Sequence, residues 1–461
     1  MKAIMLIDFG STYTKVTGVD LDAEEILATS KSFTTVETDI CIGLDKAIRL
    51  LELKTGALDW KFKYGCSSAA GGLRMVAVGL VDDLTSKAAK EAALSAGAKV
   101  LKVYSMELTD DDIDDINLLK PDILLLTGGT DGGNQKIVLH NARQLRKTKG
   151  NFPIIFSGNR SVKTQVCNLL EAANKEVIPT DNVMPTFGVL NILPAREAIK
   201  EVFLDKIIEA KGIKNAENLI DNVLMPTPLA VMNGAKLLGD GYSRESGIGD
   251  LIVVDVGGAT TDVHSVCDGL PTIPNVYLKG IEEPRVKRSV EGDLGARYSL
   301  KSVIEISNKK LMMNALNIGE SDLEDLIKRL VNNPELIGDD LGLIRGFDDL
   351  IAALVTKESV TRHSGVLKEH YTPFGMSYEQ FGKDLTSVTT IIGTGGPLIH
   401  SENPRKILES SSYEDEYPFV LKPKLSRFFI DDSYILAAMG LLASTNEESA
   451  YRILTKHLKE L

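Results

Sequence analysis

The sequence has few of the residues that mark several large classes of protein. Its 461 residues include only four cysteines, six histidines and one tryptophan. The cysteines are widely scattered and form no CxxC pair, as expected for a chain in a reducing compartment. The histidines show no HExxH spacing and lie near no CxxC motif, so a metal site built from protein side chains alone is not expected.

Long apolar runs are missing, and basic residues are in the minority. No run approaches the ~20 apolar residues that a membrane span needs, and Asp8 interrupts the apolar start of the chain too early for a signal peptide. The net charge of −12 argues against a general nucleic-acid or membrane-surface role. We therefore expect a cytoplasmic globular protein with no nucleic-acid or membrane partner, and this length favours two to four domains.

A ten-residue segment occurs twice, far apart in the chain. The first copy, Ile7–Val16, is IDFGSTYTKV, and the second, Val254–Val263, is VDVGGATTDV. Aligned without gaps, they share an apolar residue, an aspartate, a glycine, a small residue, a later threonine and a valine. Each copy follows an apolar run, so the pattern predicts a strand, a tight glycine turn and a second strand, with an acid at the end of the first strand.

The residues of this segment suit phosphate binding. A glycine at the turn lets backbone N–H groups approach a phosphate without a Cβ in the way, and the hydroxyls add donors. Asp8 and Asp255 stand where they would hold a hydrated Mg²⁺, which usually takes only one or two carboxylates. Either hairpin alone would be weak evidence, but the matched pair predicts a nucleotide site. The predicted phosphate-binding residues are Gly10, Ser11, Thr12 and Lys15 in the first hairpin, and Gly257, Gly258, Thr260 and Thr261 in the second.

A third glycine-rich segment follows the two hairpins in order. Residues 388–392 (VTTII) predict a β-branched strand, and Gly393–Pro397 (GTGGP) predicts a turn after it. Such a turn lets a flat group lie against the backbone, and Pro397 suits a helix start. Taken alone, the turn is only a strand-to-loop transition. As the third element in order it supports the nucleotide site, with Gly393, Gly395 and Gly396 as the contact residues.

The order of these three segments resembles the superfamily of actin, Hsp70-type chaperones and sugar kinases, which place ATP and Mg²⁺ between two similar α/β domains. The segments MLIDFGSTYTKV, Gly65–Met75, LLLTGGTDGGN and DVGGATTDVHSV together resemble the MutL/GlmL family. Its members are encoded beside adenosylcobalamin-dependent glutamate mutase and related aminomutases, and they differ from the DNA mismatch-repair protein of similar name. The likeness covers essentially the whole chain.

The resemblance implies an α/β fold with two actin-like ATPase domains around a nucleotide cleft, an inserted doubly wound α/β unit and a helical subdomain. It implies that Asp8 and Asp255 position Mg²⁺ through water, that one of them positions the attacking water, and that Gly393–Gly396 holds adenosine. Glu291 resembles an acidic turn beside the nucleotide in this group. An ordinary helix cap with a solvated charge pair explains Glu291 equally well.

The 247 positions between Asp8 and Asp255 exceed what one half of such a fold requires, so something is inserted. Strand and helix patterns alternate there, which implies a parallel, doubly wound sheet. Gly128–Gly133 follows a buried strand and precedes a helix; it is either a binding loop for an anion, a cofactor or a partner, or a plain turn. The strands expected in the insertion are Met75–Leu80, Val100–Tyr104, Ile123–Leu126, Pro153–Phe156 and one beginning at Val177.

The predicted domains are 1–70 (first ATPase half), 71–195 (inserted unit), 196–300 (second ATPase domain), 301–380 (helical subdomain) and 381–461 (adenosine loop and C-terminal return helix).

Two classes of function remain. The first is a chaperone-like ATPase that reactivates or assembles an adenosylcobalamin-dependent mutase, either glutamate mutase or an aminomutase. The second is a small-molecule kinase, in which an acceptor group replaces the attacking water, although no acceptor-binding motif is identifiable. A filament former is a third possibility for which the sequence gives no positive sign. The oligomeric state stays open.

Overall fold

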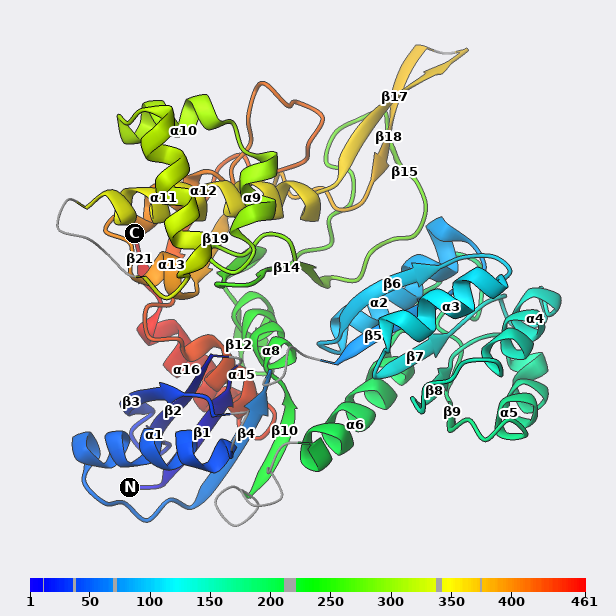
Figure 1. Cartoon of the computed structure of the whole chain (residues 1–461), viewed down its shortest axis with the longest axis horizontal. Helices are drawn as coiled ribbons and strands as arrows, with labels where there is room; N and C mark the ends of the chain where they lie inside the picture. Colours follow the sequence, from blue (N-terminus) through cyan, green and yellow to red (C-terminus); the bar gives the residue numbers. More distant parts are fainter. Residues whose placement is uncertain (11, 36–38, 69–72, 211–220, 337–341, 374) are drawn as a thin grey trace. The chain divides into compact units, whose positions relative to one another are not determined.

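The first copy of the repeated segment forms the predicted hairpin in a computed structural model of the chain, which describes residues 1–10, 12–35, 39–68, 73–210, 221–336, 342–373 and 375–461. Strands β1 (Ala3–Phe9) and β2 (Tyr13–Asp20) pair antiparallel, and β3 (Glu25–Phe33) continues the sheet beside β2. On the other side of β1, β4 (Phe62–Ser67) and β10 (Asn222–Pro226) pair in parallel. The sheet order is β10-β4-β1-β2-β3 (Figure 1).

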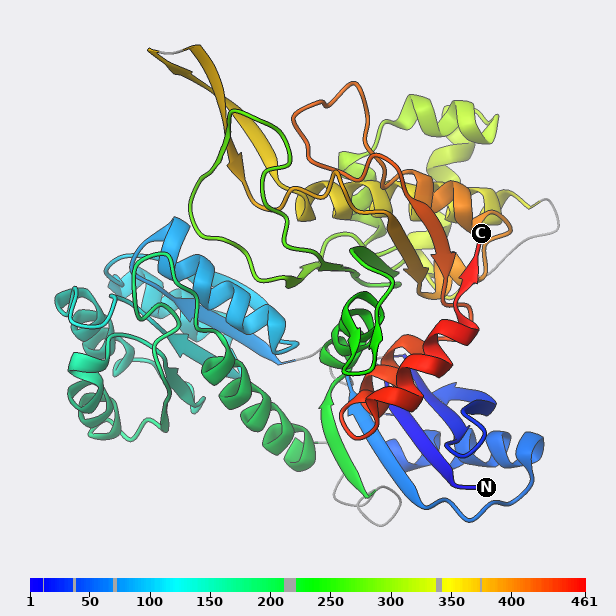
Figure 2. The same cartoon turned by 180° about the vertical axis from the view of Figure 1, so that it is seen from behind.

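Helices cover this first sheet because their apolar residues recur at helical spacing. In α1 (Ile40–Thr55), Ile40, Leu44, Ala47 and Leu51 are buried, and they share one core cluster with β1. Helices α8 (Thr227–Asp240), α15 (Ile435–Ala443) and α16 (Glu447–His457) complete this part (Figure 2). Gly440 lets α15 lie against α8, since a Cβ there would collide with the Ala230 carbonyl. Arg452 of α16 binds Glu24 at 3.0 Å.

The insertion after β4 is a second, fully parallel sheet. All five strands expected there are present, and their order is β6-β5-β7-β8-β9. Numbered within the unit this is 2-1-3-4-5, the flavodoxin-like doubly wound order. Helices α2 and α6 share one core cluster with one face of the sheet, and α3, α4 and α5 share another with the opposite face. The bounds are β5 (Arg74–Val78), α2 (Lys87–Ser95), β6 (Lys99–Tyr104), α3 (Asp110–Leu119), β7 (Ile123–Leu126), α4 (Lys136–Leu145), β8 (Ile154–Phe156), α5 (Lys163–Glu171), β9 (Val177–Pro179) and α6 (Leu193–Ala210).

The second copy of the repeated segment begins a sheet with the same strand order as the first. Strands β13 (Leu251–Val256) and β14 (Thr261–Val266) form the hairpin, and β16 (Val286–Glu291) pairs antiparallel with β14. Strands β19 (Thr390–Thr394) and β20 (Arg427–Ile430) continue in parallel beyond β13. Omitting the short last strand β21 (Lys459–Glu460), the order β16-β14-β13-β19-β20 repeats β3-β2-β1-β4-β10 element for element.

Helices and a small sheet surround this second sheet. The helices that follow β16 are α9 (Leu300–Ile306), α10 (Lys309–Leu316), α11 (Glu320–Asn332) and α12 (Leu343–His363). These helices share one apolar core with the sheet. The remaining elements are β11 (Gly241–Tyr242), β12 (Glu245–Ser246), β15 (Val276–Leu278), β17 (Val366–Thr372), β18 (Gly375–Phe381), α13 (Gly396–Ile399) and α14 (Pro404–Glu409). Strands β15, β18 and β17 form a three-stranded ribbon (Figure 1).

The chain divides into two compact units. Unit 1 comprises residues 1–234, 280–282 and 437–453, and unit 2 comprises residues 235–279, 283–436 and 454–461. The five-part division drawn from the sequence is finer than this and stays a prediction. Within the described residues, no helix combines the length and the apolar character required to cross a bilayer.

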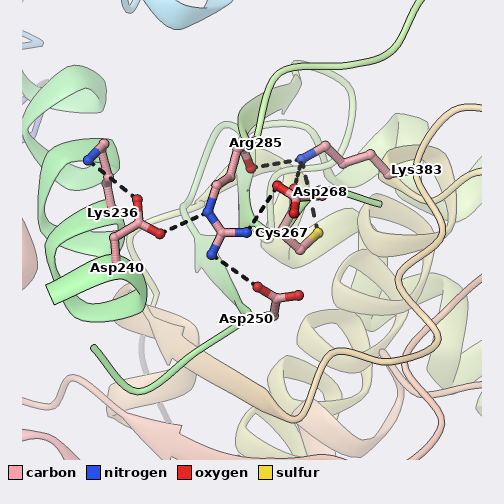
Figure 3. Close-up of polar contacts among 7 residues, drawn as sticks. All are labelled: Lys236, Asp240, Asp250, Cys267, Asp268, Arg285 and Lys383. Carbon is pink, nitrogen blue, oxygen red and sulfur yellow. Dashed lines mark hydrogen bonds and ion pairs between the residues drawn. The ribbon is translucent and has the colours of Figure 1, made fainter. Parts of the chain in front are cut away.

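Arg285 forms ion pairs with aspartates from three segments of unit 2 (Figure 3). Its guanidinium binds Asp240 at the end of α8 at 2.8 Å, and Asp250 and Asp268 at 3.1 Å each. Asp250 precedes β13 and Asp268 follows β14, so one side chain joins the base of the hairpin to α8. Beside it, the buried Lys383 ammonium donates to the backbone carbonyl oxygens of Cys267 at 2.5 Å and Arg285 at 2.8 Å.

Candidate phosphate and metal site

The two hairpin turns have the same geometry. The Gly10 N–H donates to the Tyr13 carbonyl at 3.1 Å, and the Gly257 N–H donates to the Thr260 carbonyl at 2.9 Å. A Cβ on Gly10 would lie 2.5 Å from the Tyr13 oxygen, and one on Gly257 would lie 2.7 Å from the Thr260 oxygen. Each turn therefore requires glycine at its first position, and the sequence repeat is a structural repeat.

In the first hairpin, Asp8 lies at the carboxyl end of β1 among side chains from the neighbouring strands. Its Oδ1 accepts from the Thr227 hydroxyl at 2.6 Å and from the Cys66 thiol at 3.7 Å. Its Oδ2 is 3.9 Å from Lys15 Nζ, directly across the hairpin. Burial and the Asp8 charge raise the pKa of the Cys66 thiol well above its ordinary value, so Cys66 stays protonated and acts as a donor.

The other predicted residues of this hairpin lie at or near the turn. Thr12 is exposed, and its carbonyl accepts from the Thr34 N–H at 2.9 Å. The Thr34 hydroxyl donates to the Gly10 carbonyl at 2.9 Å, which braces the turn from the side. Ser11 lies outside the described residues. Lys15 is partly exposed, which leaves its ammonium within reach of a phosphate.

In the second hairpin, Asp255 lies at the carboxyl end of β13 with a different set of neighbours. It stands opposite Asp262 on β14 and in register with Thr394 on β19. Gly395 is so close that a Cβ there would lie 2.8 Å from Asp255 Oδ1. The buried Arg288 neutralises Asp262 with two contacts, at 2.5 and 2.7 Å.

The predicted residues of the second turn divide between surface and interior. Thr260 is half-buried at the turn, and the Gly258 carbonyl accepts from the Arg297 and Tyr298 N–H groups at 2.9 and 2.8 Å. Thr261 is fully buried, and its hydroxyl donates to the Leu294 carbonyl at 2.5 Å. The Thr261 hydroxyl thus fixes the turn to the following segment, and a nucleotide contact from it stays a prediction.

The glycine-rich segment after β19 begins later than the sequence pattern indicates. Gly393 belongs to the strand: it pairs in register with Val254 and is packed against Leu398 and Leu408. The turn begins at Gly395, whose φ of +95° is a conformation for glycine. Gly396 then opens α13. Because β13 and β19 are parallel, their carboxyl ends meet at one sheet edge, and Gly395 reaches Asp255 there.

Glu291 ends β16 and faces Thr261 across the sheet. Arg362 of α12 donates to Glu291 at 2.9 Å and to Asp293 at 2.8 Å. These ion pairs raise the pKa of Arg362, although its burial works in the other direction. The acidic turn is therefore neutralised within unit 2, which favours the structural explanation of Glu291 over direct contact with a nucleotide.

Sequence reasoning missed Cys66 and Thr227 as neighbours of Asp8. Cys66 lies on β4 in register with Asp8, and Thr227 follows β10, the next parallel strand. The available signal was a Thr-Pro pair at a helix start, directly after an apolar strand. It says nothing about proximity to Asp8, because 219 positions separate the two residues.

The residues at the two aspartates fit a hydrated Mg²⁺. Carboxylate oxygen is the donor that Mg²⁺ prefers, and the ion commonly takes one or two carboxylates, several waters and substrate phosphates. The glycine turns beside each aspartate keep side-chain atoms away from where phosphate oxygens would approach. Across the described part of the chain, no three His, Cys, Asp or Glu residues gather closely enough to hold a metal ion by themselves.

Comparison with known proteins places the chain in a family. The model of the family described as MutL protein matches residues 4–458. Protein MutL of Clostridium tetanomorphum is 47% identical over 460 residues, which cover 99% of each chain. The chain belongs to the MutL family. The family-like segment Gly65–Met75 spans the end of β4 and the start of β5, with residues 69–72 outside the described part, and its Arg74 binds Asp122 at 3.2 Å.

Solved structures of more distant proteins also align with this MutL-family chain. The ethanolamine utilization protein EutJ from Carboxydothermus hydrogenoformans is 10% identical, with 97% of this chain and 90% of that chain covered and a TM-score of 0.26. The xylulose kinase from Bifidobacterium adolescentis is 11% identical, with 100% and 95% covered and a TM-score of 0.34. The repeated strand order and the repeated hairpin confirm the predicted α/β fold with two similar domains and an inserted doubly wound unit.

Proposed function

We propose that the protein binds Mg-ATP and hydrolyses it. The observation that supports this most directly is the repetition of one site plan. Each of two sheets with the same strand order ends its first strand in an aspartate and turns at a glycine that leaves no room for a Cβ. Backbone N–H groups at such turns suit phosphate oxygens, and the aspartates suit a metal that accompanies them.

In this proposal each group has a defined task. Lys15 binds phosphate charge, while the turn N–H groups of both hairpins donate to phosphate oxygens. Asp8 and Asp255 hold the water shell of Mg²⁺, and one of them orients the attacking water. The Mg²⁺ ion supplies positive charge that stabilises the charge developing on the transferred phosphoryl group. The segment beginning at Gly395 supports the adenosine.

Membership of the MutL family supports an adenosylcobalamin-dependent mutase, glutamate mutase or an aminomutase, as the partner. Such enzymes run radical chemistry and lose activity when the adenosyl group is lost and the damaged cobalamin stays bound. A protein with distinct nucleotide-bound and nucleotide-free states would favour one mutase conformation over another through its differential affinity for them. We therefore propose reactivation or assembly of the mutase as the purpose of ATP turnover.

The test follows the γ-phosphate and the mutase in one reaction. ATP labelled in the γ-phosphate is incubated with Mg²⁺ and the protein, with and without the mutase inactivated by cyanocobalamin, and mutase activity is then assayed with fresh adenosylcobalamin. The proposal expects free phosphate and recovered mutase, both lost in Asp255→Asn. Transfer of the label to a small molecule would replace hydrolysis by kinase activity. Absence of ATP binding in the wild-type protein would overturn the proposal.

A further inference from the structure

Three side chains meet at the carboxyl ends of three adjacent parallel strands in unit 1. Asp8 ends β1, Cys66 lies beside it on β4, and Thr227 follows β10 as the first residue of α8. Carboxyl ends of parallel strands are where sheets of this kind bind ligands. Of these three residues, only Asp8 has a role in the proposed function.

The Thr227 hydroxyl has one proton, and the geometry shows where it goes. Its oxygen is 2.6 Å from Asp8 Oδ1 and 3.7 Å from the Cys66 sulfur. An O–H···O⁻ hydrogen bond is typically 2.5–2.7 Å long and roughly twice as strong as a neutral one. The proton therefore lies between Thr227 and the carboxylate, and the Cys66 thiol donates weakly to the same oxygen.

The two oxygens of Asp8 are consequently unequal. Oδ1 is occupied by the hydroxyl and the thiol, and it faces α8 and β4. Within the described part of the chain, Oδ2 accepts no hydrogen bond, and its charged neighbour is Lys15 Nζ at 3.9 Å. A carboxylate that is held by one oxygen has a fixed plane and offers the other oxygen in one direction.

We propose that Thr227 is a positioning residue for the metal site: its hydroxyl fixes the Asp8 carboxylate so that Oδ2 faces the water shell of Mg²⁺. This inference rests on the proposed function. The hydrogen bond from Thr227 to Asp8 also involves a helix shared by both units, since α8 begins at Thr227 in unit 1 and ends at Asp240 in unit 2. The orientation of Asp8 is thus tied to the helix that continues into the other unit.

The second sheet supports this assignment by contrast. Asp431 follows β20 as Thr227 follows β10, and it also precedes a helix, α15. Its carboxylate accepts from the N–H groups of Ile435 at 2.9 Å and Leu436 at 3.0 Å, as a helix cap does. At the same place in unit 1, the side-chain oxygen acts as a donor to the strand aspartate. Capping alone therefore does not explain Thr227.

The experiment compares Thr227→Val, which keeps the shape and removes the hydroxyl, with Thr227→Ser, which keeps the hydroxyl. Thr148→Val is the matched control, because Thr148 is a buried threonine of the same unit whose hydroxyl donates only to the nearby Leu145 carbonyl at 2.8 Å. Each protein is measured for phosphate release against Mg²⁺ concentration, for ATP affinity with and without Mg²⁺ by calorimetry, and for melting temperature.

We expect Thr227→Val to raise the Mg²⁺ concentration for half-maximal phosphate release about tenfold, the size of a hydrogen bond to a charged group. Metal-free ATP affinity should stay within twofold of wild type, and Thr227→Ser should restore the Mg²⁺ response. A wild-type Mg²⁺ response in Thr227→Val would overturn the inference and leave the proposed function intact. A wild-type protein that binds no ATP would overturn the proposed function itself.

Discussion

The two sheets share a scaffold and differ in the side chains placed on it. Strand order, hairpin register and turn hydrogen bonds are the same in both. The residue across the hairpin from the strand aspartate is Lys15 in unit 1 and Asp262 in unit 2. The two copies therefore share a backbone that turns at glycine, but the residue opposite the strand aspartate is positively charged in unit 1 and negatively charged in unit 2.

This difference indicates a division of tasks. Lys15 is partly exposed and lies 3.9 Å from Asp8, so it is positioned to meet an anion. Asp262 is neutralised by Arg288, of which only 4% is exposed, so that pair contributes to the interior of unit 2. In the proposed function both hairpins donate turn N–H groups to phosphate; unit 1 adds the positive charge of Lys15, and unit 2 adds Gly395 close to Asp255.

The strongest test of the comparison replaces each strand aspartate by its neutral isostere. Asp8→Asn and Asp255→Asn should each reduce phosphate release by about a hundredfold or more, because positioning of the metal and of the attacking water depends on the charge. Steady-state release of phosphate from Mg-ATP measures this effect, with circular dichroism to check the fold.

Asp110→Asn is the control, since Asp110 is an exposed carboxylate at the start of α3 whose partner is Lys147. It should retain wild-type turnover. If either strand variant also kept the wild-type rate, only one of the two hairpins would act on the phosphates, and the functional equivalence of the aspartates would be lost.

The second test replaces, by a neutral residue, the charged residue that lies opposite each strand aspartate in its hairpin. Asp262→Asn removes the negative charge that faces the buried Arg288, and breaking such a charge pair typically costs about 3 kcal/mol in the free energy of unfolding. Lys15→Met should leave stability nearly unchanged and weaken ATP binding about tenfold, through loss of one charge-assisted contact.

Urea unfolding and calorimetric titration with ATP separate the two outcomes. Loss of stability in Lys15→Met together with normal ATP affinity would contradict the assignment of Lys15 to the phosphates. Normal stability in Asp262→Asn would show that water or another acceptor replaces the lost carboxylate beside Arg288.

Local sequence signals predicted much of this architecture, because each signal lies within a short stretch of neighbouring residues. The duplicated ten residues fix a strand, a glycine turn and a second strand, so both hairpins were recognisable. In the insertion, apolar runs alternating with helical periodicity gave all five strands. These features depend on residues that are neighbours in the chain.

Features that depend on pairing between distant strands were not predictable from these signals. Cys66 meets Asp8 only because β4 pairs with β1, and Thr227 joins them only because β10 pairs with β4 after the insertion. The turn predicted at Gly393 was placed two residues early, since glycine and threonine there are held in the strand by pairing with β13. A glycine marks a turn in the sequence, but sheet pairing decides whether the turn forms.

The third test concerns the close contact at Gly395. Gly395→Ala forces a Cβ to 2.2 Å from the Val256 carbonyl oxygen and 2.8 Å from Asp255 Oδ1, and it imposes a side chain at a φ of +95°. We expect a loss of at least about 2 kcal/mol in stability from the backbone conformation and the collision. ATP binding should become about tenfold weaker, because Asp255 or the loop must move.

Gly249→Ala in the same unit is a matched control for backbone strain. Its φ is +90°, and a Cβ there would meet nothing within 4 Å. It should lose less stability than Gly395→Ala, because only the backbone conformation is strained, and it should keep its ATP affinity. Equal ATP affinity in both variants would separate Gly395 from the nucleotide site and would weaken the contribution assigned to unit 2.

The smallest expected effect concerns acid stability, in which the two units should also differ. The fully buried histidines His264 and His363 both belong to unit 2. Burial lowers the pKa of His264 to about 3, and it lowers the pKa of His363 as well. Because these folded-state values lie below the unfolded value of about 6.5, the unfolded chain binds more protons as the pH falls. Each histidine should therefore remove up to about 1.4 kcal/mol of stability per pH unit below 6.5, down to its folded-state pKa.

The single tryptophan, Trp60, lies in unit 1 and allows the two units to be followed separately. Between pH 7 and 5, the protection of the β13 and β14 amides against hydrogen exchange, taken relative to their intrinsic exchange rates at each pH, should fall while Trp60 fluorescence stays native. His264→Leu should reduce this loss of protection without a loss of stability at pH 7, since neither ring nitrogen of His264 has a hydrogen-bond partner among the described residues. An equal loss of protection in β1 and β2 would mean that the two units unfold together, and the repeat would then be one cooperative structure rather than two.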